Sequence, residues 1–164
     1  MWIRSLAVAL ILASCVHLNA SEAAPGDMQP RLDLKALAEP LQDLTPADRA
    51  LVDKAIKLID RRQHLQALTY LTELTVSNPK NSSLRVLRAY VLLELGNVVG
   101  ALGDARTAEA SGSHAAYRCW FLAQVAYLAG DKPLCRREIK HLAGSATYAA
   151  GVDQLRSDLK SSPK

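Results

Sequence analysis

Aromatic residues and cysteines are scarce in this chain of 164 residues. Aromatics make up 5% of the sequence and there are three cysteines, whereas alanine and leucine are abundant among the 49% of apolar residues. Because alanine and leucine are strong helix formers, this composition favours a helical fold. The net charge is +4, but acidic residues are spread among the basic ones and no basic run interleaves with aromatics. We therefore expect no nucleic-acid partner.

Motifs that would carry catalysis or hold a metal are also missing from the sequence. It contains no H-E-x-x-H, no C-x-x-C and no G-x-S-x-G elbow. The four histidines, His17, His64, His114 and His141, are scattered without metal-ligand spacing. No pair of carboxylates can be nominated as a general acid and base. The sequence therefore predicts no catalytic residues, no metal and no cofactor.

The beginning of the chain, positions 1–24, has the pattern of an export signal. The apolar run Leu6–Ala13 is shorter than the roughly 20 residues that span a bilayer, and it suits the core of a signal peptide. The stretch Leu12–Cys15 resembles the bacterial lipobox, in which the cysteine becomes the first mature residue and carries the lipid. We therefore expect positions 1–24 to hold a signal peptide and the start of a tether, with Cys15 as the lipid attachment site and membrane contact only through that anchor.

Ordinary signal cleavage near Ala20 or Ala23 is the alternative to lipidation. In that case the protein would be secreted without a lipid. Both alternatives export the protein, to the bacterial periplasm or as a membrane-anchored lipoprotein.

Several small residues recur along the chain at a fixed offset. Ala55, Ala89 and Ala123 share this offset, and Gly130 follows Gly96 by the same distance (89 − 55, 123 − 89 and 130 − 96 are all 34). Arg62 stands where these two glycines stand. Self-similarity at a fixed period indicates a repeat architecture.

Helix start and stop signals divide each repeat into two helices. Thr45 followed by Pro46 marks a helix start, whereas Gly96 followed by Asn97 marks the end of one helix and the cap of the next. We expect helices at about 32–38, 46–61, 64–76 and 147–159, with the intervening helices delimited by Gly96, Gly112, Gly130 and Gly144. No run of strands is expected.

This pattern resembles the tetratricopeptide repeat (TPR) family over about residues 48–149. The resemblance implies an all-α, right-handed superhelical solenoid of helix-turn-helix repeats with terminal capping helices. Within a repeat region at 46–149, the three units would cover about 48–81, 82–115 and 116–149. A linker with a short capping helix would precede them at 25–45, and a capping helix and tail would follow at 150–164. Arg62 replaces a turn glycine and Cys135 replaces a small alanine of the family pattern.

In TPR proteins the first helices of successive units line a concave groove that binds peptides. By this resemblance, residues one repeat apart on those helices would face a protein or peptide partner, because aromatic and apolar groups there bury a large area. The candidate groove residues are Arg49, Val52, Ile56, Ile59, Val86, Tyr90, Leu93, Glu94, Tyr117, Trp120, Gln124 and Tyr127. Part of this stripe would instead form the core between repeats.

Cys119 and Cys135 are the two cysteines outside the signal segment. In an exported chain they could pair as a disulfide, or they could remain small buried apolar side chains.

The leading hypothesis is a non-catalytic protein–protein interaction scaffold, exported and lipid-anchored, that helps to assemble a cell-envelope complex. One alternative is a cytosolic chaperone similar to the TPR chaperones of type III secretion. Another is a structural or oligomerising subunit whose groove is filled by its own residues 25–45 or by a second copy. The sequence leaves the partner's identity and the oligomeric state open.

Overall fold

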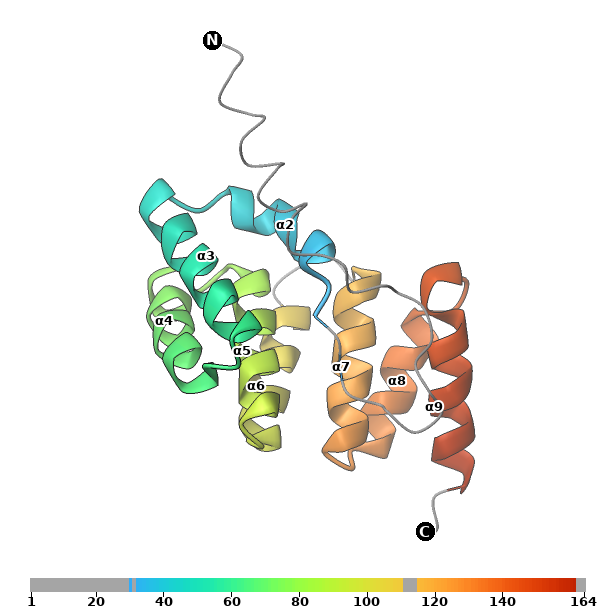
Figure 1. Ribbon diagram of the computed structural model, residues 1–164. Coiled ribbons are helices and arrows are strands. Elements are labelled where there is room, and N and C mark those ends of the chain that lie inside the picture. Colours follow the sequence, from blue (N-terminus) through green and yellow to red (C-terminus); the bar gives the residue numbers. More distant parts are fainter. Residues whose placement is uncertain (1–29, 31, 111–114, 162–164) are drawn as a thin grey trace.

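The structure is a computed structural model that describes residues 30, 32–110 and 115–161. Over these residues the chain is all-helical and has no strand, which confirms the predicted all-α class. The elements are α2 (Leu34–Gln42), α3 (Pro46–Asp60), α4 (His64–Ser77), α5 (Ser82–Glu94), α6 (Val98–Ala110), α7 (Ala116–Leu128), α8 (Lys132–His141), the 3-10 helix η1 (Ala146–Tyr148) and α9 (Ala149–Ser161) (Figure 1). The expected signal segment and Cys15 lie outside the described residues.

Five of these helices begin with the same side-chain cap. The side-chain oxygen of the residue before the helix accepts a hydrogen bond from the backbone N–H three residues later, which satisfies a donor that has no partner within the helix. The pairs are Asp33 with Ala36 (3.1 Å), Thr45 with Asp48 (3.1 Å), Asn81 with Leu84 (3.2 Å), Asn97 with Gly100 (2.9 Å) and Asp131 with Leu134 (3.0 Å). Local sequence therefore sets where α2, α3, α5, α6 and α8 start.

A left-handed turn recurs at regular intervals along the chain. The helices α4, α6 and α8 begin at His64, Val98 and Lys132, and both intervals are 34 (98 − 64 and 132 − 98). Two residues before each start the backbone has a positive φ, with 57° at Arg62, 77° at Gly96 and 74° at Gly130. A left-handed residue ends a helix and redirects the chain. The offset in the sequence thus corresponds to a repeated backbone conformation, which Arg62 adopts although it is not a glycine.

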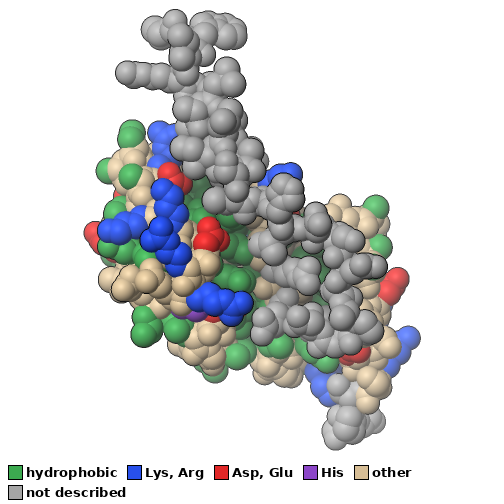
Figure 2. Space-filling model, viewed as in Figure 1, with side chains coloured by type: hydrophobic (Ala, Val, Ile, Leu, Met, Phe, Trp, Pro, Cys, Tyr) green, Lys and Arg blue, Asp and Glu red, His purple; other side chains and the backbone are tan. Residues whose placement is uncertain are grey.

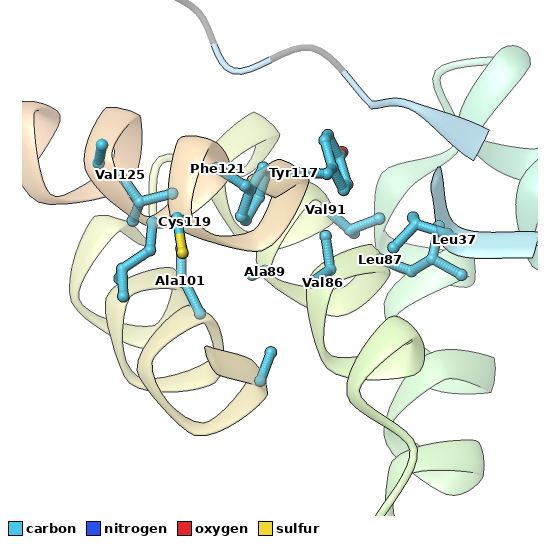
Figure 3. Close-up of a cluster of buried hydrophobic side chains, with 14 of the residues drawn as sticks. Leu37, Val86, Leu87, Ala89, Val91, Ala101, Tyr117, Cys119, Phe121 and Val125 are labelled. Atoms are coloured by element: carbon cyan, nitrogen blue, oxygen red, sulfur yellow. The ribbon is translucent and has the colours of Figure 1, made fainter. Parts of the chain in front are cut away.

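Consecutive helices from α3 to α9 pack against one another. Alanines lie at these contacts and are fully buried, which lets the helix backbones approach closely. These alanines are Ala55, Ala67, Ala89, Ala101 and Ala123. Figure 3 shows part of this core, where Phe121 of α7 and Val86 of α5 lie in one cluster with Ala89 and Ala101.

A polar network joins α4, α5 and α6 inside this row of helices. The Arg88 guanidinium donates to both carboxylate oxygens of Asp104 at 2.6 Å and to the Thr75 hydroxyl at 2.8 Å. Asp104 and Thr75 are buried, so the bidentate ion pair has little contact with water. The hydrogen bonds from the guanidinium to Asp104 raise the pKa of Arg88, which therefore stays charged.

The helices α9 and α2 pack on the row at different places. At one end α9 follows α8, and Val152, Leu155 and Leu159 of α9 are buried. By contrast, α2 lies against α5, within the row, rather than against its neighbour in the chain (Figure 1). Within the described part of the chain, none of the helices has the length and hydropathy needed to span a bilayer.

Candidate protein-binding face

The structure divides the twelve predicted groove residues into a buried group and an accessible group. Five of them are buried, namely Val52, Ile59, Val86, Tyr117 and Gln124. They belong to the contacts between helices and do not line an open surface, since an inner helix of a helical row must pack against its neighbours. Arg49 is exposed on α3, and the remaining residues are accessible in varying degrees.

Four half-buried side chains form what we term the inner strip: Ile56 of α3, Tyr90 and Leu93 of α5, and Tyr127 of α7. They pack against the core and also reach the surface. Tyr90 follows Ile56 by one repeat, and Tyr127 follows Leu93 by one repeat (90 − 56 and 127 − 93 are both 34), so one pair of equivalent positions links α3 to α5 and another links α5 to α7. Figure 2 shows Lys and Arg side chains gathered over α3, and Lys57 near the end of α3 and Arg61 just after it are exposed.

Charged groups adjoin the inner strip near the turn between α3 and α4. His64 Nε2 lies 3.8 Å from Glu94 Oε2. Burial raises the pKa of Tyr90, and the Glu94 carboxylate beside its hydroxyl raises it further, whereas the Arg62 cation lowers it. Tyr90 is therefore a neutral hydrogen-bonding group at neutral pH, placed between an apolar strip and a charged margin. Such a side chain offers both buried area and a polar contact to a ligand.

Trp120 is part of a packed contact, although it was predicted to be a groove residue. Its ring stacks on Tyr148 with 5.6 Å between centroids and an angle of 22° between the planes. A Cβ added at Gly151 would lie 2.7 Å from Trp120 Cζ2, so the ring lies directly against the α9 backbone. Trp120 thus joins α7 to the C-terminal helix.

The segment of residues 32–44, termed here the N-terminal strap, covers another part of the predicted groove. The backbone N–H of Asp33 donates to the Tyr117 hydroxyl at 2.9 Å. Leu37 is 1% exposed and lies beside Leu87 of α5 (Figure 3). Burial raises the pKa of Tyr117 well above its usual value. Tyr117 therefore holds the strap and is not available as an open contact residue.

Both cysteines in the described residues are free and buried, so the possible disulfide between Cys119 and Cys135 is absent from the structure. Cys119 lies nine residues before the end of α7, whereas Cys135 lies three residues after the start of α8. At 1.5 Å per residue this corresponds to an axial offset of about 9 Å between adjacent helices, beyond the Cα separation of about 4.4–6.8 Å in disulfides. Burial raises the pKa of each thiol to about 11.

Metal-ligating side chains do not gather in groups of three in the part of the chain that the structure describes. Among residues 30, 32–110 and 115–161, no three His, Cys, Asp or Glu side chains are arranged to hold a metal ion. The carboxylate of Glu138 on α8 is fully buried and accepts from the Arg137 side chain of the same helix at 2.7 Å. What the face offers a ligand is apolar area with a polar margin.

Comparison with known proteins adds no further identification. Neither the protein-family models nor the curated proteins contain a match to this chain. The fold and the face define an all-α protein of successive helical hairpins with a half-buried apolar strip.

Several residues of this face were not foreseen from the sequence. The strap residue Leu37, its anchor Asp33 and the Tyr148 ring beneath Trp120 were not singled out. A signal was present for the strap, because Leu34, Leu37, Leu41 and Leu44 recur at intervals of three and four residues. Nothing local marked Tyr148 as the neighbour of a tryptophan on α7, because the whole of α8 separates the two in the sequence.

Proposed function

We propose that this chain is a TPR-like solenoid that acts as a non-catalytic scaffold and binds a protein segment along the inner strip. The observation that carries the proposal is the inner strip itself, whose side chains form two pairs of equivalent repeat positions, one on α3 and α5 and one on α5 and α7, and stay half-exposed. Groups that combine an apolar body with a polar tip favour protein contacts. Three helical hairpins supply a rigid support for these groups.

The proposal includes export and attachment to a membrane through a lipid on Cys15. It is supported by the apolar run and the lipobox-like stretch at the start of the sequence. Intact-mass analysis of the protein from its native membrane fraction tests it. A chain that begins at a diacylglyceryl-modified Cys15 is expected, whereas recovery from the cytosol with an intact N-terminus would favour the chaperone alternative.

Site-specific photocrosslinking tests the binding face. A photoreactive phenylalanine analogue replaces Tyr90 or Tyr127 on the inner strip, and in control chains it replaces Val76 or Val99, which are 74% and 83% exposed on α4 and α6. Irradiation of cells is expected to give one protein adduct, identified by mass spectrometry, from positions 90 and 127 and none from the controls. Adducts of equal yield at Val76 and Val99 would exclude the inner strip as the specific site.

A structural subunit with a self-filled groove is the second candidate function, because the N-terminal strap already occupies part of the face. In that case the face would serve the fold of the chain itself or of a second copy. The crosslinking experiment separates the two functions, since a self-filled face predicts adducts within the chain or between two copies of it.

A further inference from the structure

We propose that the N-terminal strap is a displaceable occupant of the binding face, seated where an amphipathic helix of a partner binds. This inference rests on the proposed function, because it describes the partner and the regulation of the same face. The partner's chemistry is that of the strap itself: a short helix with leucines at intervals of three and four residues. Four observations lead to this assignment.

The strap makes its contacts through one apolar edge. Leu37 and Leu44 are buried, Leu34 and Leu41 are half-buried, and the intervening Lys35, Ala36 and Gln42 are exposed. Intervals of three and four residues place Leu34, Leu37 and Leu41 on one side of α2, and Leu44 follows in the turn after this helix. The face therefore already accommodates a helix with a leucine edge, which is a common mode of helix recognition in grooves.

The strap is weak as a helix. α2 has nine residues, and isolated helices of that length are marginal in water. Pro40 lies within it and has no N–H, so the helix lacks the hydrogen bond that this residue would give to the carbonyl of Ala36. Packing on the face, chiefly against α5, must therefore supply most of its stability. An element of this kind belongs to the least stable part of a protein and opens most readily.

Departure of the strap would uncover apolar surface that needs another cover. Leu37 lies against the group of Leu87, Val86 and Val91, which are at most 1% exposed, and Tyr117 would lose the donor to its hydroxyl (Figure 3). Water is a poor replacement for Leu37 at such a surface. A partner helix with the same leucine spacing would restore these contacts.

The uncovered surface would be continuous with the inner strip. Val86 of the strap's seat and Tyr90 and Leu93 of the strip follow one another at intervals of four and three residues, so they lie on one side of α5. A partner segment longer than α2 could therefore cover both surfaces, whereas the strap covers the seat alone. This difference in length gives the partner an advantage over a competitor that is tethered in the same chain.

A peptide of the strap sequence tests the inference without any knowledge of the partner. A labelled peptide of residues 32–44 is titrated into three full-length chains, the wild type, Leu37→Asp and Ala36→Asp. Leu37→Asp puts a charge at a buried position and releases the strap, whereas Ala36→Asp adds the same charge at an exposed position of the same helix. Fluorescence anisotropy gives the affinities.

The peptide is expected to bind the Leu37→Asp chain about ten-fold or more tightly than the other two chains, because a face closed for about 90% of the time reduces the apparent affinity ten-fold. A peptide that itself carries Leu37→Asp should not bind. Equal affinities for the three chains would overturn the inference. Absence of binding to a Leu37→Asp chain with an unchanged helical circular dichroism signal would do so as well.

Hydrogen exchange of the wild-type chain covers the case in which Leu37→Asp does not fold. The amides of α2 are expected to exchange about ten-fold or more faster than those of α5, since the strap opens without the rest of the fold. Equal protection of α2 and α5 would show that α2 is a fixed part of the core. Neither assay contains a partner. A result that overturns the displaceable strap therefore does not decide the scaffold function, which the crosslinking experiment tests separately, and a negative crosslinking result does not decide whether the strap opens.

Discussion

At the scale of single residues, Arg62 adopts the left-handed backbone conformation that glycine adopts at the equivalent positions of the other repeats. Its φ of 57° lies in the left-handed region, which costs a residue with a side chain about 1–2 kcal/mol, whereas the equivalent Gly96 and Gly130 adopt it freely. Its side chain is exposed, and the cation lowers the pKa of Tyr90. Arg62 therefore adds a charge to the margin of the inner strip at the expense of stability.

A reciprocal pair of substitutions tests this interpretation. Arg62→Gly is expected to stabilise the protein by about 0.5–1 kcal/mol because it removes the left-handed strain, part of which is offset by the flexibility of glycine in the unfolded chain. Gly96→Arg should destabilise by about 1 kcal/mol, and the cause would be the backbone alone, since an added Cβ at Gly96 meets nothing within 4 Å. Urea denaturation measures both. A loss of stability in Arg62→Gly would mean that the Arg62 side chain contributes more than its strain costs.

At the scale of the elements, α9 differs from the hairpins that precede it because it is fixed by an aromatic contact. Trp120 of α7 stacks on Tyr148 and lies against Gly151 at the beginning of α9. The glycine is needed there because any side chain would occupy the space of the indole ring. The contact joins the end of the chain to the third hairpin and uses a residue that would otherwise enlarge the binding face.

Two glycine-to-alanine substitutions in helices distinguish packing from helix propensity. Gly151→Ala is expected to destabilise the protein by about 1–3 kcal/mol because its methyl group would collide with the Trp120 ring. Gly103→Ala in α6 is the matched control, since an added Cβ there meets nothing within 4 Å, and it should stabilise by about 0.5–1 kcal/mol. Thermal or urea denaturation gives both values. If both variants were stabilised, the contact between Gly151 and Trp120 would not be tight.

Sequence patterns predicted the elements better than the contacts between them. The caps at Thr45 and Asn97 and the glycine turns are local signals, and the helices begin within two residues of the expected positions at Pro46, His64 and Ala149. Sequence patterns did not predict which of the groove residues are exposed and which are covered by other parts of the chain. Tyr117 is covered by a residue 84 positions away, and no periodicity encodes such a contact.

At the scale of the whole molecule, two buried thiol groups make the free energy of unfolding depend on pH above neutrality. Burial raises the pKa of the Cys119 and Cys135 thiols to about 11, whereas the pKa of a thiol in the unfolded chain is about 8.5. The folded state therefore binds more protons than the unfolded state between these values. By linkage, the stability from the buried neutral thiols is fully present below about pH 8.5 and is lost as the pH rises towards about 11.

The urea concentration at the unfolding midpoint of the wild-type chain should consequently decrease as the pH is raised from 8 to 10. The double variant Cys119→Ala, Cys135→Ala should be less stable at pH 7 because it leaves small cavities, yet its midpoint should fall less steeply with pH. Denaturation curves of both proteins at pH 7, 8, 9 and 10 make the comparison. Parallel slopes would assign the alkaline loss of stability to other groups, of which Tyr117 is the first to examine.

The hydrogen bond between Asp33 and Tyr117 also has a consequence for the order in which the chain is made. The two residues are 84 positions apart, and at about 5–20 residues per second the ribosome needs about 4–17 s to pass from the first to the second. Throughout that interval the leucines of α2 exist without the complete surface that later covers them. A nascent chain therefore exposes the leucines of the N-terminal strap to other molecules before it can bind the strap itself.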